Sequence, residues 1–419
     1  SRGLGDVYKR QLPMYEKVVA AGAARAIVVE TGASVARRDE DTTWDAFVGD
    51  DRDVTPVPRG PDDVMNILFS SGTTGGPKAI PWTHATPIKS AMDGHFHQDI
   101  HPGDVVAWPT NLGWMMGPWL IYATFINRAT MALFDDAPTE AEFGEFVEQA
   151  GVTILGVVPS LVAAWKTGRI MELYDWSAIR LFSSTGEASN PVDMAYLMGL
   201  AGNKPIIEYI GGTEIGGGFL SGTLLQPAIP SLFTSPTLGL DIILLDDDKR
   251  RSNVGEVFIV PPSIGLSTRL LNRDHHEAYY AGVPVVSGVQ LRRHGDHMER
   301  LENGYYHALG RVDDAMNLGG IKVSSTEIER VVLPVAGVAE AAAVAVAPPG
   351  GGPSHLVIFA VPEPGSEAQQ SQWRSAMQEA IREHLNPLFK IHGVVAVESL
   401  PRTASGKVKR RDLREEYSG

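Results

Sequence analysis

The sequence contains no cysteine. Disulfide bonds, a thiolate nucleophile and zinc held by cysteines are therefore excluded. It also lacks an apolar run of the ~20 residues that a membrane-spanning helix needs, because its longest apolar stretch, 152–165, contains Pro159 and Ser160. Positive charge is scarce, since 36 lysines and arginines stand against 50 aspartates and glutamates, which gives a net charge of −14. We therefore expect no nucleic-acid partner and no membrane partner.

The remaining composition is typical of a globular protein. Of the 419 residues, 43% are hydrophobic and 21% are charged, which is enough for two or three domains or subdomains. No secretory signal is recognisable, and we expect a cytoplasmic location. Residues 1–11 have no helical or strand period, and the piece GDVYKRQ resembles a translated sequencing adapter. We interpret 1–11 as a non-native scar with native residues missing upstream; a polar native loop is the alternative.

Hydrophobic periodicity predicts alternating helices and strands over the first half of the chain. Residues 12–22 favour a helix, and residues 26–30 and 64–69 favour strands. The alternation continues to about residue 200, which predicts an α/β layered domain. Residues 238–245 and 255–260 flank a charged turn, as in a β-hairpin, and indicate an antiparallel subdomain from about 220 to 310.

The character of the sequence changes after Arg311. A small strand–helix region follows, with a strand over 356–361 and an amphipathic helix over 369–384. We predict an α/β protein with a large multi-subdomain N-terminal domain of layered sheets and helices, residues 12–312. A small α+β C-terminal lid domain, residues 313–419, follows a boundary at Asp313–Asp314.

The segment SSGTTGGPK, Ser70–Lys78, directly follows a predicted strand. Its small residues let the backbone approach a ligand closely, and its amides, hydroxyls and ammonium suit phosphate oxygens. It does not match the Walker A pattern, because Pro77 stands at the second glycine position and Ala79 follows the lysine. A plain glycine-rich turn is the alternative.

This segment resembles the phosphate loop of adenylate-forming enzymes, and further motifs of that superfamily follow in order. They are TGEASNP (185–191), EYIGGTEIGGG (208–218), HGDHMERLENGYYHALGR (294–311), GRVDDAMNLGGIKVSSTEIE (310–329) and PRTASGKVKRR (401–411). TNLGWMMGPW (110–119) resembles acetyl-CoA synthetase-like enzymes, in particular plant peroxisomal probable acyl-activating enzymes. The chain then looks like an N-terminally truncated member of the superfamily.

The resemblance implies an AMP-forming acid–CoA ligase. A small carboxylic acid would attack the α-phosphate of ATP, giving acyl-AMP and pyrophosphate, and CoA would then displace AMP. The implied cofactors and substrates are ATP, Mg²⁺, CoA and the acid. The alternatives are an adenylation enzyme that loads a separate carrier protein, and an inactive nucleotide-binding remnant. The sequence leaves the acid and the oligomeric state open.

The same resemblance implies residue roles. The implied catalytic residues are Lys407, Glu214 and Thr213, with Glu214 also the Mg²⁺ ligand. ATP binding is implied for Ser70, Thr73, Thr74, Lys78, Gly186, Glu187, Ala188, Glu208, Tyr209, Ile210, Gly211, Gly212, Asp296, Arg311 and Lys322. The acyl pocket would be lined by Met115, Met116, Thr185 and Gly211, the CoA tunnel by Gly319 and Gly320, and the hinge would lie at Asp313.

Each role has a structural alternative. Lys407 would belong to a solvated basic tail, Glu214 would lie on the surface in a turn, and Asp296 would form a structural pair with an arginine. In acetate-specific relatives a tryptophan stands where this chain has Gly211. The resemblance therefore implies a roomier pocket that takes a medium-sized or branched acid, unless Trp114 or Trp119 refills it.

Two features depart from the pattern or compete with it. Lys322 stands where close relatives often have arginine, so its phosphate contact loses the planar fork of a guanidinium. The spacings of His95, His97 and His101, and of His294 and His297, resemble metal ligands. No cysteine accompanies them, and we predict partly exposed polar side chains instead of a zinc site.

Overall fold

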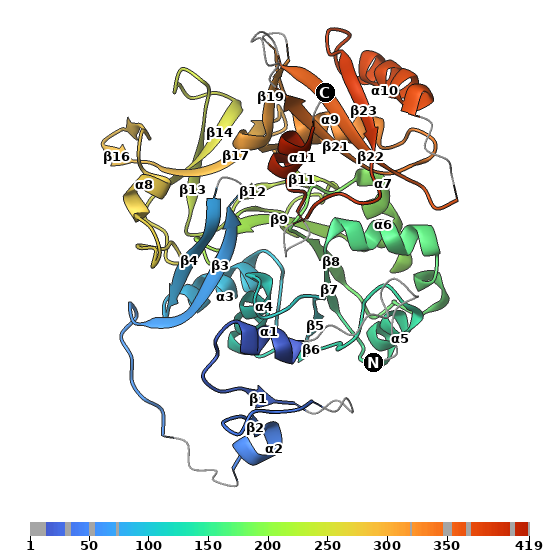
Figure 1. The fold of residues 1–419 in the computed structure, drawn as a ribbon. Coiled ribbons are helices and arrows are strands. Elements are labelled where there is room, and N and C mark those ends of the chain that lie inside the picture. The colour runs from blue at the N-terminus through green and yellow to red at the C-terminus, as the bar shows by residue number, and fades with distance from the viewer. Residues whose placement is uncertain are drawn as a thin grey trace.

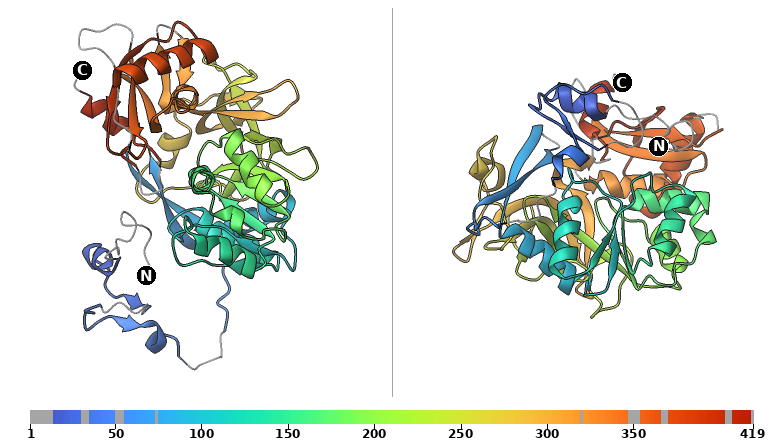
Figure 2. Two further views of the ribbon diagram at one scale, coloured as in Figure 1. Left: turned by 90° about the vertical axis from the view of Figure 1, so that its right-hand side faces the viewer. Right: turned by 90° about the horizontal axis from the view of Figure 1, so that it is seen from below.

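A computed structural model describes most of the chain. The described residues are 14–29, 35–49, 55–72, 75–318, 321–346, 354–365, 370–402 and 407–417. The predicted scar, 1–11, lies outside them. The first described unit consists of α1 (Met14–Ala20), β1 (Ile27–Val28), β2 (Thr42–Thr43) and α2 (Trp44–Phe47). It lies apart from the body of the molecule (Figures 1 and 2), and its first helix and strand fall where the sequence predicts them.

The body is built on a seven-stranded sheet in which five neighbouring strands are parallel. In sheet order the strands are β12 (Ser235–Pro236), β10 (Gly217–Ser221), β9 (Ile206–Gly212), β8 (Leu181–Ser184), β7 (Ile154–Val157), β5 (Val105–Ala107) and β6 (Thr130–Ala132). The strands β10 and β12 run antiparallel at one edge. Parallel strands need helical crossovers, so both faces of the sheet are covered.

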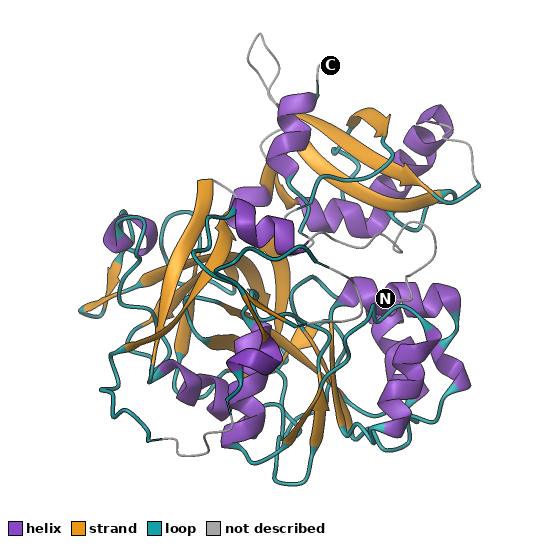
Figure 3. Cartoon of the chain, turned by 60° about the horizontal axis from the view of Figure 1, so that its bottom comes forward, coloured by secondary structure: helices purple, strands orange, loops and turns teal. Residues whose placement is uncertain are grey.

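Helices cover both faces, as Figure 3 shows. On one side are α3 (Thr86–Phe96) and α4 (Met116–Ile126); on the other are α5 (Ala141–Gln149), α6 (Pro159–Gly168), the short η1 (Met171–Leu173) and α7 (Pro191–Leu200). Neighbouring strand residues point to opposite faces: Ile154 packs in the core under α4, whereas Leu155 packs in the α5–α7 core. The predicted α/β layering is confirmed.

A second, antiparallel sheet follows. Its order is β11 (Leu232–Phe233), β18 (Tyr306–Arg311), β17 (Arg292–Arg300), β14 (Val254–Val260) and β13 (Asp241–Leu245), and α8 (His275–Tyr279), β15 (Val285–Val286) and β16 (Val289–Gln290) lie beside it. The predicted hairpin is β13–β14. The register of β17 shifts opposite β14, and Gly295 there has φ +91, which favours glycine. Bulges of this kind re-aim side chains.

The phosphate-loop segment lies in a β-hairpin. β3 (Val64–Gly72) pairs antiparallel with β4 (Gly75–Thr83), and Gly72 lies opposite Gly75. The sequence predicts the first strand and misses the second, because Pro77 and Pro81 argue against a strand there. The Trp82 indole donates to the Thr213 carbonyl at 2.7 Å, which holds the hairpin against the turn after β9.

The C-terminal part begins after β18. Its elements are η2 (Val312–Asp314), β19 (Ala315–Leu318), β20 (Ile321–Ser324), α9 (Ser325–Val332), β21 (Val338–Val346), β22 (His355–Pro362), α10 (Gln370–His384), β23 (Ile391–Ala396) and α11 (Arg410–Glu416). A capping box of Ser324 and Glu327 begins α9. One core cluster uses residues from Met316 to Val394. The domain boundary at Asp313–Asp314 stays a prediction, and no described helix is long and apolar enough to cross a membrane.

Candidate functional site

Two buried carboxylates, Glu214 and Asp296, lie on either side of one imidazole. Glu214 belongs to the turn between β9 and β10, whereas His294 and Asp296 lie on β17. His294 Nε2 is 3.0 Å from Asp296 Oδ2, and its Nδ1 is 3.7 Å from Glu214 Oε1. Glu214 and Asp296 are only 8% and 9% exposed. Two separate sheets thus bring their acidic groups to one place.

Cations surround this pair of carboxylates. Burial opposes the ionisation of Glu214, but His294 and Lys78 outweigh it and lower the pKa of the carboxyl. Burial likewise opposes the ionisation of Asp296, and His294 and Arg311 outweigh it, so that its pKa is also lowered. The exposed Lys407 also lowers the pKa of the Asp296 carboxyl, after His294 and Arg311.

The cations are held by neighbours of their own. Arg311 Nη1 donates to Asp296 Oδ1 at 3.2 Å and to the His294 carbonyl at 3.2 Å. The Lys78 ammonium lies 4.7 Å from the centre of the Tyr279 ring, and the Arg292 guanidinium lies 4.1 Å from it. Burial lowers the pKa of Lys78, more than the Glu214 carboxylate raises it.

This arrangement has the chemistry of a nucleotide site. A polyphosphate needs concentrated positive charge, which Lys78, Arg292 and Arg311 supply. Asp296 Oδ1 accepts from Arg311, and Oδ2 lies 3.0 Å from His294 Nε2. A carboxylate has about four acceptor positions, so with respect to the described residues two positions remain for a pair of hydroxyl donors, as on a ribose.

Several implied site residues lie outside the described residues. These are Thr73, Thr74, Gly319 and Gly320, together with the side chains of Asp313 and Lys322. Ser70 is described: its hydroxyl is buried and has no hydrogen-bond partner among the described residues.

The segment implied to pack on adenine follows β8. Thr185 is buried, Gly186 and Ala188 are exposed, and Glu187 Oε2 accepts from the Ser160 amide at 3.0 Å. Glu208 on β9 is 3% exposed, and burial raises its pKa to about 7.

Tyr209 is enclosed. Its hydroxyl donates to Asp93 Oδ2 at 2.6 Å and accepts from the Trp119 indole at 3.1 Å. Its ring is buried in the core, so only the backbone of Tyr209 can face a ligand. The neighbouring Ile210, Gly211, Gly212 and Thr213 are partly exposed.

Two of the implied acyl-pocket residues, Met115 and Met116, pack in one cluster. Met116 belongs to the core under α4 with Trp119 and Tyr209, and Met115 packs against the same cluster. Gly211 is different, because a Cβ there would lie 2.0 Å from the Gly217 carbonyl oxygen of β10. The space next to Gly211 is thus occupied by a neighbouring strand, and the expectation that a tryptophan at 211 simply fills a cavity is wrong.

The structure bears on the structural alternatives for Glu214, Asp296 and the histidines. A surface position for Glu214 is wrong, because the side chain is buried. An Asp296–Arg311 pair is present. Partial exposure is wrong for two of the histidines, since His97 is 2% and His294 is 7% exposed. His97 Nε2 accepts from the Leu238 amide at 3.0 Å, a contact between α3 and a distant loop that histidine spacing does not reveal.

Sequence reasoning missed a buried polar network behind β9. The Lys89 ammonium donates to Asp93 Oδ1 at 2.6 Å and to the Thr237 hydroxyl at 2.8 Å, and both charged side chains are fully buried. Asp93 Oδ2 also accepts from the Gly218 amide at 2.8 Å. The network ties α3 to β9 and β10, which carry Glu214 between them. The i,i+4 spacing of Lys89 and Asp93 was the available signal, although it is equally typical of an exposed helix face.

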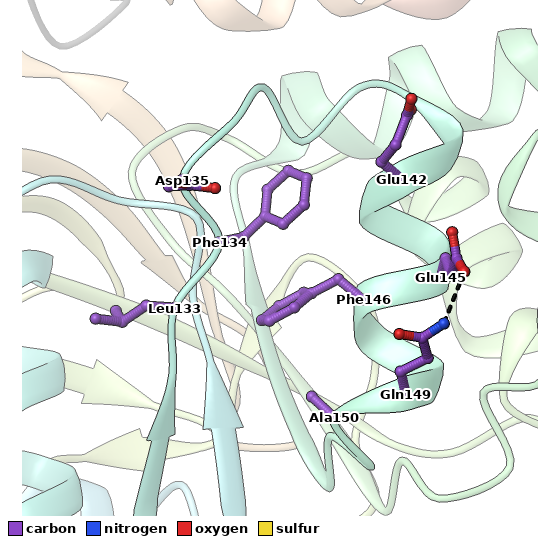
Figure 4. A pocket seen from close by; sticks show the side chains of 8 residues that line it. All are labelled: Leu133, Phe134, Asp135, Glu142, Glu145, Phe146, Gln149 and Ala150. Carbon is purple, nitrogen blue, oxygen red and sulfur yellow. Dashed lines mark hydrogen bonds between the residues drawn. The ribbon is translucent and has the colours of Figure 1, made fainter. Parts of the chain in front are cut away.

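A surface hollow of about 480 Å³ lies elsewhere, between the end of β6 and α5 (Figure 4). Phe134 and Phe146 line it, and Glu145 accepts a hydrogen bond from Gln149 within α5. None of the residues with an implied role lines this hollow. It is a feature of the surface and adds no group to the site.

Comparisons with known proteins identify the family of the chain. The model of the AMP-binding enzyme family matches residues 9–266, and that of the AMP-binding enzyme C-terminal domain matches residues 327–407. Hexanoyl-CoA synthase of Cannabis sativa is 48% identical over 98% of this chain and 59% of its own. Probable acyl-activating enzyme 17, peroxisomal, of Arabidopsis thaliana is 49% identical over 98% and 59%.

The fold agrees as well. The solved structure of acetoacetyl-CoA synthetase from Streptomyces lividans superposes with a TM-score of 0.81 at 24% identity, covering 91% of this chain and 59% of that one. The chain belongs to the AMP-binding enzyme family. It spans 59% of the length of the two curated relatives described above.

Proposed function

We propose that this chain is an ATP-dependent acid–CoA ligase. A carboxylate attacks the α-phosphate of ATP to form acyl-AMP and pyrophosphate, and the CoA thiol then displaces AMP to form the acyl-CoA. The observation that carries the proposal is the buried Glu214–His294–Asp296 cluster, with the Arg311 guanidinium 3.2 Å from Asp296.

The charges that we assign to these residues suit the first step. That step brings two anions together, so positive charge must lie between them. Lys407 supplies it at the attacking carboxylate and the α-phosphate, and Lys78 supplies it at the terminal phosphates, with the hydroxyls of Thr73 and Thr74. Asp296 binds the ribose hydroxyls, and Arg311 adds a donor to the ribose or phosphate.

Glu214 fits a Mg²⁺ ion that is shared with phosphate. It is a buried carboxylate whose pKa is lowered, with Lys78 close by. Among the described residues no group of three or more histidine and acidic side chains forms a protein cage. Mg²⁺ is commonly held by one or two carboxylates plus substrate phosphates. The ion, when bound, neutralises phosphate charge.

In our proposal the second step, thioester formation, uses a different face of the C-terminal domain from the first step. The small domain rotates about Asp313, so that Gly319 and Gly320 border the CoA tunnel and Lys322 contributes a cation. Support for this assignment is the order of the motifs in the sequence. A hinge needs freedom in φ and ψ.

The acid is proposed to be of medium length, with hexanoate as the first candidate. One observation supports this: a relative that is 48% identical is named hexanoyl-CoA synthase. The cytoplasmic location stays a prediction; the Arabidopsis relative bears the name peroxisomal.

An acid panel tests the proposal directly. The protein is incubated with ATP, Mg²⁺ and each acid from acetate to octanoate, and pyrophosphate release is measured. We expect acid-dependent release that is largest near hexanoate, and formation of AMP and hexanoyl-CoA when CoA is added. Transfer to a carrier protein but not to CoA would favour a carrier-loading enzyme. No acid-dependent release would identify a nucleotide-binding remnant.

A further inference from the structure

His294 has no assigned role, although it lies between two groups that have one. Its side chain is 4% exposed. The centre of the Phe219 ring is 4.4 Å from the centre of the imidazole, and Phe219 is fully buried. The imidazole is thus enclosed against an aromatic wall, and its position is determined by packing.

The two ring nitrogens of His294 face different carboxylates. Nε2 lies 3.0 Å from Asp296 Oδ2. His294 lowers the pKa of the Asp296 carboxyl, and an ionised carboxylate can only accept, so Nε2 is the ring nitrogen that carries a proton toward Asp296. Nδ1 is buried, has no hydrogen-bond partner among the described residues and faces Glu214 Oε1 at 3.7 Å. That distance is too long for a hydrogen bond.

The backbone of β17 explains why both side chains point into the site. His294 and Asp296 are two residues apart on β17, and the 3.0 Å contact between them shows that both side chains lie on the same side of the strand. The register shift opposite Glu256–Phe258 and the positive φ of Gly295 bend the strand between them. A Cβ at Gly295 would also lie 2.7 Å from Arg311 Nη2, so the bend brings Arg311 close to the backbone there.

We propose that His294 is a positioning residue that orients Asp296 so that its two remaining acceptor positions receive the ribose hydroxyls of a bound nucleotide. The inference rests on the proposed function, in which Asp296 binds ribose. His294 takes one position on Oδ2, Arg311 takes one on Oδ1, and the carboxylate is held at both ends. Without His294, Asp296 can rotate toward the exposed side of Arg311.

The test measures discrimination between ribose and its deoxy forms. AMP, 2′-deoxy-AMP and 3′-deoxy-AMP are titrated into the protein by calorimetry, without Mg²⁺ and without acid. Each deoxynucleotide lacks one hydroxyl that would donate a hydrogen bond to the charged Asp296. The wild type should therefore bind AMP about tenfold more tightly than either deoxynucleotide. His294→Phe keeps a ring but has no donor, and should reduce that ratio about fivefold. His294→Gln keeps a donor and should retain most of it.

A double-mutant cycle separates positioning from a general structural role. Asp296→Asn should abolish the discrimination, and adding His294→Phe to Asp296→Asn should then change the ratio no further, because the two residues act as one unit. Thermal unfolding of each variant shows whether it folds. If His294→Phe does not fold, His294→Asn replaces it. The asparagine side chain is one bond shorter than that of glutamine, so its amide does not reach Asp296.

The outcomes distinguish this inference from the proposed reaction. Unchanged discrimination in His294→Phe, or an additive loss in the double variant, overturns the positioning role. A wild type that binds all three nucleotides equally also overturns it, because Asp296 then does not read the ribose. Discrimination without any acid-dependent pyrophosphate release overturns the proposed reaction and leaves the positioning role standing. Absence of AMP binding overturns both.

Discussion

Glu214 and Asp296 lie in the interior of the N-terminal part, whereas Lys407, which the proposed reaction needs beside them, is exposed. The first two are held by strands of two sheets and by a shared imidazole. Lys407 precedes α11, whose Arg410 pairs with the C-terminal part itself. The contrast suggests that the nucleotide side of the site is preformed and that the lysine is delivered by the placement of the small domain.

The strongest test of this contrast is Lys407→Ala. If Lys407 bridges carboxylate and α-phosphate, the change should lower acid-dependent pyrophosphate release by about 10²-fold or more, the scale of losing one preorganised charge. Thioester formation from supplied acyl-AMP should stay largely intact. Lys409→Ala is the matched control, because Lys409 is also exposed and pairs with Asp412 at 3.4 Å; both half-reactions should persist. Equal loss of both steps in Lys407→Ala would indicate a folding role.

The site residues that the sequence predicts differ from those that it misses: the first lie in sequence motifs, and the second depend on the fold. Glu214, Asp296 and Lys407 each lie in a motif with its own spacing, so the sequence indicates them without knowledge of the fold. His294 was missed as a functional group because its contacts depend on the bend at Gly295 and on β9 of the other sheet. Its spacing to His297 pointed to a metal pattern that the structure does not form among the described residues.

The fold shows a similar limit. Apolar periodicity predicted the layered sheet, the β13–β14 hairpin and α10 because burial on one or both faces leaves a local signature. The partner strand β4 was missed because its prolines obscure it. The buried Lys89–Asp93 pair was missed because full burial of a lysine becomes stable only with partners such as Thr237, far away in the sequence.

A second test asks what holds the segment with Lys407. Arg410 donates to both oxygens of Glu329 and to Asp314, and its side chain is 12% exposed. Arg410→Ala removes the arginine that two largely buried carboxylates share, although Arg414 still lies 3.8 Å from Asp314, and should cost about 3 kcal/mol of unfolding free energy. Arg411→Ala removes only an exposed pair with Glu415, and its urea midpoint should equal that of the wild type. A similar loss in both variants would show that Arg410 is not a special anchor.

A third test uses the pH dependence of stability to examine the buried Glu208 on β9. Burial raises the pKa of Glu208 to about 7 from 4.5. Between those values the folded state holds a proton that the unfolded state has lost, so stability falls as pH rises through this window and stays lowered above it.

Glu208→Gln keeps an oxygen that accepts from the Ser189 hydroxyl and the Ser231 amide, but it cannot ionise. The variant should therefore be more stable than the wild type at pH 8, by on the order of 2 kcal/mol, and close to it at pH 4. Urea unfolding at both pH values measures this, with the exposed Glu302→Gln as control. An advantage of equal size at both pH values would mean that Glu208 does not titrate in this way.

The smallest expected effect concerns the chain length of the acid, whose proposed pocket lies next to β9. Each buried CH₂ contributes about 0.8 kcal/mol, which is roughly fourfold in kcat/KM per carbon if the pocket is apolar. We expect such a rise from acetate to hexanoate. Gly211→Trp cannot test it, because the added side chain would meet the backbone of β10 and should unfold the hairpin. Met115→Trp is the better variant, since Met115 is only partly buried beside Met116 and Trp119.

Met115→Trp should move the preferred acid to a shorter chain without lowering pyrophosphate release from that acid, because only apolar space is lost. Leu173→Trp, at an exposed position in η1, should leave the preference unchanged. A wild-type preference for acetate over butanoate would show that the pocket is already closed. Trp119 is then the group to examine, since its indole donates to the Tyr209 hydroxyl and its ring centre lies 5.4 Å from that of Trp108, directly behind β9.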